Sequence, residues 1–153
     1  MIRKTITIRS DSRHLEPLRK KLERFLKGLK IPKKTRSLML VAIGEACTNS
    51  IRHSYEGENN RLIRVAIEDF RDRTVFRIRD YGRKINLSKV KLPKLPPTQP
   101  HGLGIHIIRS FMDRVVYGTG HRLGNEVVLT KYKKQGDSQE NAGQERARRR
   151  SAH

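Results

Sequence analysis

The stretch "LVAIGEACTNSIRHSY", residues 40–55, decides the fold and raises the question of function. At 100° per residue, the apolar side chains of Ile43, Cys47 and Ile51 share one face of a helix, whereas Glu45 and Asn49 point to the opposite face. That opposite face also carries apolar residues one or two turns earlier, and burying a carboxylate among such residues is costly. We therefore expect Glu45 to face a lined pocket; the alternative is a solvated face that carries an ordinary glutamate and asparagine.

The segments on either side of this helix show strand and helix patterns. Alternating polar and apolar residues indicate strands, and leucines spaced three or four apart indicate an amphipathic helix early in the chain. The expected elements, in chain order, are a strand at 5–8, a helix over about 15–28, the quoted helix from residue 32 or 33 to about 54, strands at 62–70 and 74–80, a helix over about 104–114, and strands near 114–117 and 126–132.

This order, β-α-α-β-β-α-β-β, predicts the α+β class, with a mostly antiparallel sheet of about five strands and three helices on one face. A doubly wound parallel sheet fits poorly, because strands and helices do not alternate one by one. Residues 1–132 hold these elements and form the expected domain. Residues 133–153 are polar, charged and nearly devoid of large apolar side chains, so we expect a disordered basic tail.

The chain is strongly basic, with a formal net charge of +20. Residues 133–153 carry six Lys and Arg against three acidic residues, so the tail accounts for +3 and residues 1–132 for +17. The charge therefore belongs mainly to the folded body. Such a field favours anionic partners, among them nucleic acid, nucleotide phosphates, anionic lipid or an acidic protein, without choosing between them.

Several classes of protein are disfavoured by composition. There is no apolar run of the roughly 18 residues that a membrane span needs, and the first residues lack the apolar centre of a signal peptide, so we expect a cytoplasmic protein without a membrane segment. The single cysteine, Cys47, cannot form an internal disulfide and is most simply a small core residue. Zinc is disfavoured because no Cys/His cluster has ligand spacing.

Two further segments carry chemistry. Asp80 ends an alternating strand and is followed two residues later by Gly82, which indicates either a simple turn or a carboxylate at a pocket edge where a flat ligand approaches the backbone. Gly102 and Gly104 stand at the mouth of the third helix, where free backbone N–H groups and the helix dipole favour phosphate; the alternative is a loop closure. The intervening loop has four prolines between residues 93 and 100 and is too long to be a simple connection.

Taken in order, these elements resemble the ATP-binding fold shared by gyrase, Hsp90, histidine kinases and MutL, the GHKL group. The segments "GEACTNSIRHSY" (44–55), "IRDYG" (78–82), "HGLGIHIIRSFMD" (101–113) and "LTKY" (129–132) are similar to the serine/threonine-protein kinase anti-sigma factors of bacteria, the RsbW and SpoIIAB type. The resemblance covers about residues 1–132. It implies a two-layer α/β sandwich of the Bergerat type.

The resemblance also implies roles for the two polar residues of the quoted helix. Asn49 would hold Mg²⁺, a hard cation that prefers oxygen ligands. Glu45, one helical turn away, would act as general base toward a substrate hydroxyl. Phosphoryl transfer depends mainly on such positioning and on charge neutralisation.

The remaining implied roles are contacts to ATP. Asp80 would accept the adenine amino group with help from Thr130 through water, Gly82 would let the base pack against the backbone, Gly102, Leu103 and Gly104 would present N–H groups to the phosphates, and residues 86–101 would form a mobile lid.

The function implied by the resemblance is an ATP-dependent serine/threonine-protein kinase that also sequesters a sigma factor. Its phosphoacceptor would be an anti-anti-sigma protein of the STAS type, and the chain would form a homodimer. A catalytically weak nucleotide-binding module that only switches partners is one alternative. A nucleic-acid-binding protein is another, suggested by charge alone and not favoured, because aromatic residues make up only 5% of the chain and no stacking platform is evident. A histidine-kinase catalytic domain fits less well, since His14 has no matching dimerisation helix.

Overall fold

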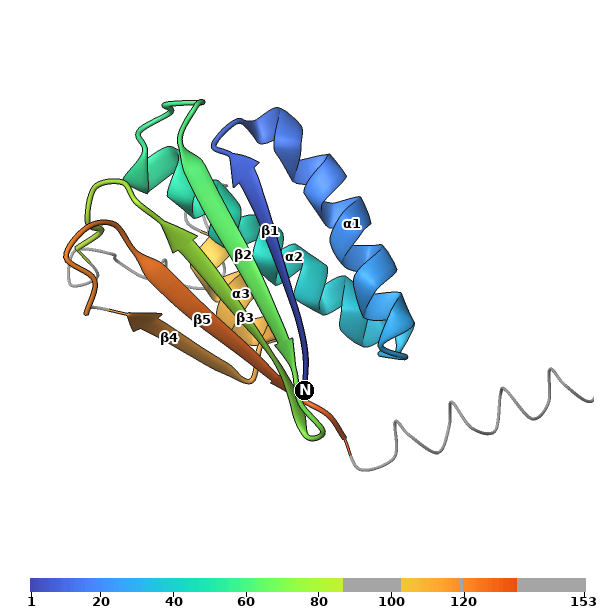
Figure 1. Cartoon of the computed structure of the whole chain (residues 1–153). Helices are drawn as coiled ribbons and strands as arrows, with labels where there is room; N and C mark the ends of the chain where they lie inside the picture. The colour runs from blue at the N-terminus through green and yellow to red at the C-terminus, as the bar shows by residue number, and fades with distance from the viewer. Residues whose placement is uncertain (87–102, 119, 135–153) are drawn as a thin grey trace, which may run out of the picture.

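The computed structural model describes residues 1–86, 103–118 and 120–134 (Figure 1). Its elements, in chain order, are β1 (Ile2–Arg9), the short helix η1 (Ser12–His14), α1 (Leu15–Gly28), α2 (Lys33–Asn49), the π turn η2 (Ser50–Ser54), β2 (Leu62–Asp69), β3 (Arg73–Asp80), α3 (Leu103–Phe111), β4 (Arg114–Gly118) and β5 (Glu126–Tyr132). The predicted order of strands and helices is confirmed.

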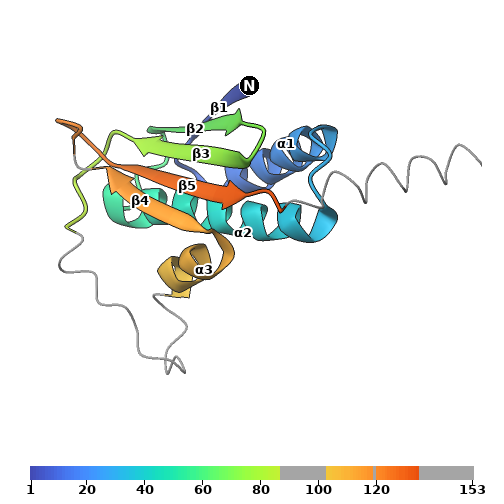
Figure 2. The same cartoon turned by 90° about the horizontal axis from the view of Figure 1, so that it is seen from below.

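The five strands form one sheet in the order β1-β2-β3-β5-β4, and every neighbouring pair is antiparallel. Figure 2 shows α1, α2 and α3 together on one side of this sheet. The predicted α+β class, with an antiparallel sheet and three helices on one face, is therefore confirmed.

The core lies between the sheet and the helices because each strand alternates its side chains between two faces. Along β2 the residues Ile63, Val65 and Ile67 are fully buried, whereas their neighbours are exposed or half-buried. Side chains that face the helices from β3 and β5 are buried in the same way. The helices supply the other half of the core, with Leu18, Leu22 and Leu26 from α1, Met39, Ile43 and Cys47 from α2, and Ile108 from α3.

Helix α2 lies at the centre of the helical layer and contacts both α1 and α3. This position explains why Ala42 is fully buried although it lies away from the stripe that contains Ile43 and Cys47. Burial raises the pKa of the Cys47 thiol to about 12, because an apolar interior disfavours the thiolate. Cys47 is thus the core residue that its apolar neighbours predicted.

Two element ends differ from expectation. The α-helix of the quoted stretch ends at Asn49 and is followed by the π turn η2, in which Tyr55 N–H donates to the Ser50 carbonyl at 2.9 Å. Helix α3 ends at Phe111 rather than near residue 114, because Arg114 already pairs with Thr130 as the first residue of β4.

One residue beyond the expected domain of residues 1–132 makes a described contact. Lys133 still packs against the hairpin of β2 and β3: its Nζ lies 2.9 Å from the buried Asp69 carboxylate and donates to the Phe70 carbonyl. The rest of the expected tail from residue 135, and the expected lid apart from Asn86, lie outside the described residues. Among those described, no helix is long and apolar enough to cross a bilayer.

Gly124, just before β5, occupies a backbone position that excludes a side chain. Its φ is +73°, and a Cβ there would lie 2.6 Å from the Cα of Tyr81. We expect Gly124→Ala to lower the free energy of unfolding by about 3 kcal/mol, from left-handed strain and backbone overlap together. Denaturant unfolding followed by circular dichroism measures this change.

The matched control is Gly120→Ala in the same connection, where an added Cβ meets nothing within 4 Å. That substitution should change stability by less than about 0.5 kcal/mol, as surface changes usually do. Equal effects at the two glycines would contradict the close approach described for Gly124.

Candidate functional site

Asp80, the last residue of β3, is a buried carboxylate at the edge of the helical layer. It is only 2% exposed, yet it has no cationic partner among the described residues. Instead it accepts five hydrogen bonds from neutral donors among the described residues. Ser50 Oγ donates to Oδ2 at 2.9 Å. Oδ1 accepts from Ser54 Oγ at 2.5 Å, from Gly82 N at 3.2 Å, and from the backbone N and side-chain Nδ2 of Asn125 at 3.2 and 3.0 Å. The bonds are unevenly divided, with four on Oδ1 and one on Oδ2, so Oδ2 keeps room for another donor.

Ser50 and Ser54 reach Asp80 from η2, the π turn that follows α2. Single π turns inserted in helices are rare and are found frequently at functional sites. The turn also brings Tyr55 beneath the strand ends, where its hydroxyl donates to the Leu62 carbonyl at 2.5 Å and accepts from Tyr81 N–H at 2.7 Å. The carboxylate is therefore held from the helix side and from the sheet side at once.

Asn125, which was not anticipated from the sequence, joins this site from the far end of the chain. Its backbone continues the β3–β5 pairing by one step beyond Arg79, with Asp80 N–H donating to the Asn125 carbonyl at 2.9 Å. Its side-chain amide donates to Asp80 and to the Arg83 carbonyl, and its Oδ1 accepts from Ile85 N–H at 2.8 Å. Asn125 therefore ties the carboxylate to the segment that leaves β3.

Only a weak sequence signal pointed to Asn125. A Gly-Asn pair before a strand is typical of an ordinary turn. The serines at 50 and 54 were similarly inconspicuous, because they belong to a segment that was expected to be a regular helix end.

Gly82 lets the backbone after Asp80 pass directly over η2. A Cβ at this position would lie 2.5 Å from the Ser54 carbonyl oxygen and 2.7 Å from Cδ1 of Tyr55. The lack of a side chain is thus required by packing against the protein itself, next to the carboxylate. The approach of a flat ligand to the Gly82 backbone, expected from the Asp-x-Gly pattern, stays a prediction.

Glu45 and Asn49 of α2 meet the first turn of α3. A Cβ at Gly104 would lie 2.6 Å from Glu45 Oε2 and 3.6 Å from Asn49 Oδ1. The oxygens of both side chains are therefore directed at the start of α3, where the first N–H groups have no partner within the helix and the dipole is positive. Both residues are half-buried.

The two polar clusters adjoin each other. Asn49, which faces α3, is followed directly by Ser50, which binds Asp80, and successive Cα atoms are about 3.8 Å apart. The fold therefore brings Glu45, Asn49, Gly104, Asp80 and Gly82 into one region at the C-terminal end of α2. Leu103 begins α3 but its side chain is not described, and Gly102 lies outside the described residues.

Thr130 does not belong to this region, which corrects the expectation that it assists Asp80. It pairs with Val75, five residues before Asp80, a separation of about 17 Å along a strand. Because side chains alternate, Thr130 and Val75 point away from the helices, whereas Asp80 points toward them, like Phe76 and Ile78. Asn125, which directly precedes β5, lies beside Asp80 instead.

The combined site suits a flat, phosphorylated ligand. An acceptor with one free position lies at one end, the Gly82 backbone follows it, and the N-terminus of α3 lies at the other end. The Asn49 and Glu45 oxygens are hard ligands of the kind that Mg²⁺ takes singly or in pairs together with phosphates. An all-protein metal cage is absent from the described residues, where no group of three His, Cys, Asp or Glu side chains is placed to hold an ion.

An antiparallel sheet with three helices on one face, a strand-end carboxylate and a Glu-x-x-x-Asn helix defines the class of GHKL-type nucleotide-binding domains. The chain belongs to the histidine kinase-like ATPase domain family, whose sequence profile matches residues 8–131.

Within that family the chain is similar to bacterial proteins named serine-protein kinase RsbW and anti-sigma F factor. It is 30% identical over 100 residues to the serine-protein kinase RsbW of Bacillus velezensis, a match that covers 60% of this chain and 61% of that protein. It is 31% identical over 112 residues to RsbW of Listeria innocua, covering 67% of this chain and 69% of that protein. It is 32% identical over 94 residues to the anti-sigma F factor of Clostridium beijerinckii, covering 59% and 66%. The chain thus spans about three fifths of the length of the Bacillus relative.

Proposed function

We propose that this chain binds ATP with Mg²⁺ and transfers the γ-phosphoryl group to a serine or threonine of a partner protein, and that it also sequesters a sigma factor. The observation that carries the proposal is the convergence of Glu45, Asn49 and the start of α3 beside the buried Asp80. The names serine-protein kinase and anti-sigma factor among its relatives support the same assignment.

At the adenine end, Asp80 would select the base. Its contacts are all with hydrogen-bond donors, and the free position on Oδ2 suits one more, such as the exocyclic amino group of adenine. A base with a carbonyl at that position would bring two acceptors together and would be rejected, as unpaired buried polar groups are costly. Asn125, rather than Thr130, would hold the carboxylate in this orientation.

At the phosphate end, the N–H groups in the first turn of α3 would receive phosphate oxygens. Asn49 Oδ1 would hold the magnesium ion. The Glu45 carboxylate would lie beside the ion or beside the reacting hydroxyl. The ion, when bound, neutralises charge on the phosphates. Gly104 allows this approach, because a larger side chain there would meet the Glu45 carboxylate.

The transfer itself needs an acceptor for one proton. The partner's hydroxyl oxygen would attack the γ-phosphorus, the bond from that phosphorus to the bridging oxygen would break, and ADP would leave. Glu45 would take the hydroxyl proton, which is the role its half-buried position beside the phosphate end suits. Phosphorylation would add negative charge to the partner's binding surface, which would end its binding where that charge meets a carboxylate or an apolar contact.

The partners follow from the same proposal. The sigma factor would be held in the cytoplasm by a homodimer of this chain, and a STAS-type anti-anti-sigma protein would be the phosphoacceptor. A nucleotide-binding module that captures a sigma factor without phosphorylating anything is the second candidate, supported by the modest identity to the named kinases.

Two measurements separate these candidates. Calorimetry of the full chain with ATP, ITP and no nucleotide, each with and without Mg²⁺, should show saturable heat for ATP that Mg²⁺ strengthens, and little for ITP. Incubation with γ-labelled ATP and STAS-domain proteins from the same cell should then label a serine or threonine. Heat without labelling would favour the sequestering module, and a folded chain that gives no heat with ATP would contradict both.

A further inference from the structure

The sheet face that points away from the helices is lined with arginine. Figure 1 looks onto this face with the helical layer behind it, and no described element covers it. Strand β3 contributes Arg73, Arg77 and Arg79, which alternate with the buried residues of the opposite face. The register places Arg3 and Arg9 of β1, Arg64 of β2 and Arg114 of β4 on the same side.

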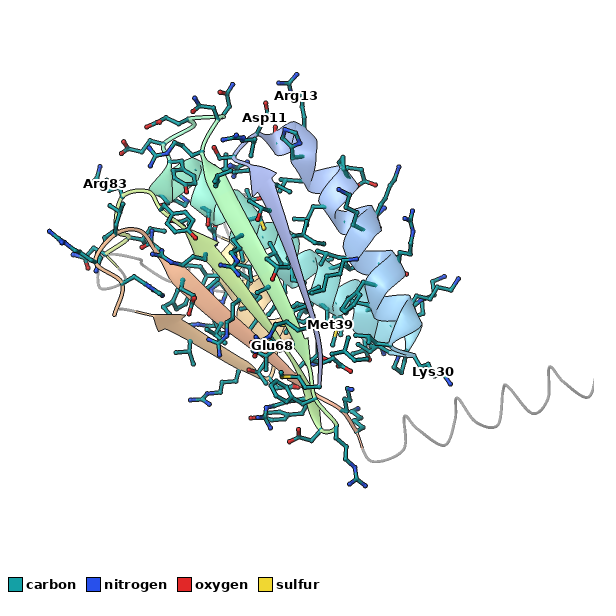
Figure 3. The ribbon with its side chains drawn as sticks, viewed as in Figure 1. Asp11, Arg13, Lys30, Met39, Glu68 and Arg83 are labelled. Carbon is teal, nitrogen blue, oxygen red and sulfur yellow. The ribbon has the colours of Figure 1, made fainter. Side chains whose placement is uncertain are left out.

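Few carboxylates offset these charges. The strands place only Glu68 and Glu126 on this face, and Figure 3 shows Glu68 there. Glu68 pairs with Arg3 at 3.1 Å, whereas Glu126 is shared between Arg77 at 3.6 Å and His121 at 3.5 Å. Seven arginines against two glutamates leave the strand residues of this face with a net charge of +5.

The register also sets two arginines against each other. Arg64 lies directly opposite Arg79 on the neighbouring strand, an arrangement that destabilises a sheet when no counter-charge is present. The Arg79 guanidinium donates to the Leu123 carbonyl at 2.6 Å and stacks on the Tyr81 ring. Arg64 and Arg114 are exposed, and their side chains make no ion pair or hydrogen bond with the described residues. These two guanidinium groups are available to an anion.

We propose that this arginine face binds the phosphate backbone of single-stranded nucleic acid. Every cation that the described strands place on the face is arginine, whose planar fork binds phosphate through two parallel hydrogen bonds. The register also places Ala66, Val75, Val116 and Val128 on this face, but its charged residues are mostly arginines, and an excess of positive charge is typical of nucleic-acid interfaces.

A single strand fits this face better than a duplex. An extended strand can follow the sheet across several rows of side chains, whereas a rigid cylinder touches it along one line. Tyr132, at the end of β5, is 50% exposed and pairs with Arg73, so a base can stack there beside a guanidinium. The site lies on the side of the sheet opposite to Asp80 and is independent of the proposed kinase activity.

The test uses the full chain and fluorescein-labelled 15-nucleotide oligo-dT and oligo-U, with binding followed by anisotropy over a range of salt concentrations. The double variant R64E/R114E should weaken binding at least about tenfold and lower the salt slope by about 1.4, the value for two lost contacts to single-stranded phosphates. The matched control K21E/K27E makes the same change in net charge on exposed positions of α1. It should weaken binding less than threefold.

The possible outcomes are distinct. An equal loss of oligonucleotide affinity in the two double variants would overturn the proposal, because binding would then depend on total charge alone. The absence of binding by the wild-type chain would also overturn it. Tighter binding to a duplex of the same length would overturn the single strand as the ligand and favour duplex. Full competition by poly-glutamate at equal charge concentration would overturn nucleic acid as the ligand and favour an acidic protein. Both variants should keep the heat of ATP binding, which separates this result from any failure of the proposed kinase function.

Discussion

Glu45→Gln is expected to slow phosphoryl transfer to the partner protein by about 10²- to 10⁴-fold, the usual contribution of a general base. The glutamine has nearly the same shape and can still lie beside Gly104, so ATP affinity should change by less than about threefold. Its amide has no basic position to take the hydroxyl proton. Single-turnover transfer of labelled phosphate, measured with the partner in excess, reports this step without product release.

The control for this experiment is Glu58→Gln. Glu58 is exposed and its carboxylate lies 3.5 Å from Arg61, a surface contact that contributes little to stability. Transfer in that variant should equal wild type. If Glu45→Gln transfers at the wild-type rate, the assignment of the base is wrong, and Glu45 serves only to line the phosphate end.

Asp80→Asn should lower ATP affinity by about 100-fold. The side chain keeps its size, but one of its two acceptors becomes an NH₂ donor. Four donors already surround the Oδ1 position, so the amide would turn its nitrogen toward the Oδ2 position and oppose the adenine amino group. Two facing buried donors cost about 1–3 kcal/mol, and the upper part of this range corresponds to about two decades of affinity.

A change in base preference distinguishes this effect from unfolding. In Asp80→Asn the new donor should favour a carbonyl, so the ratio of ATP to ITP affinity should fall, a result that mere destabilisation does not produce. Thermal unfolding without nucleotide checks that the variant folds. Asp72→Asn, on the exposed turn between β2 and β3 where it pairs with Arg73, is the matched control and should leave both affinities unchanged. An unaltered ATP to ITP ratio in Asp80→Asn would show that Asp80 does not read the base.

Local patterns predicted the elements well because they depend on near neighbours. Alternation indicated β2 and β3, and helical spacing placed Glu45 and Asn49 on the side of α2 away from its main apolar stripe. The Asp-x-Gly pattern at residue 80 correctly indicated the end of a strand. Each of these features is set by residues within a few positions of one another.

Thr130 shows where such reasoning failed. It was assigned to the site from a short matching segment, but a strand alternates its faces, and the register between β3 and β5 puts it on the wrong one. The position beside Asp80 is taken by Asn125, 45 residues away in the chain. Nothing near Asp80 in the sequence specifies that pairing.

The sequence alone therefore determined the α+β order of elements, the basic character of the body and the polar pair on α2, because hydrophobic periodicity and charge are properties of the chain itself. The tertiary structure decided which donors surround Asp80 and that arginines from four strands gather on one uncovered face. These contacts depend on strand register and on the π turn after Asn49, which are settled only when distant segments pack together.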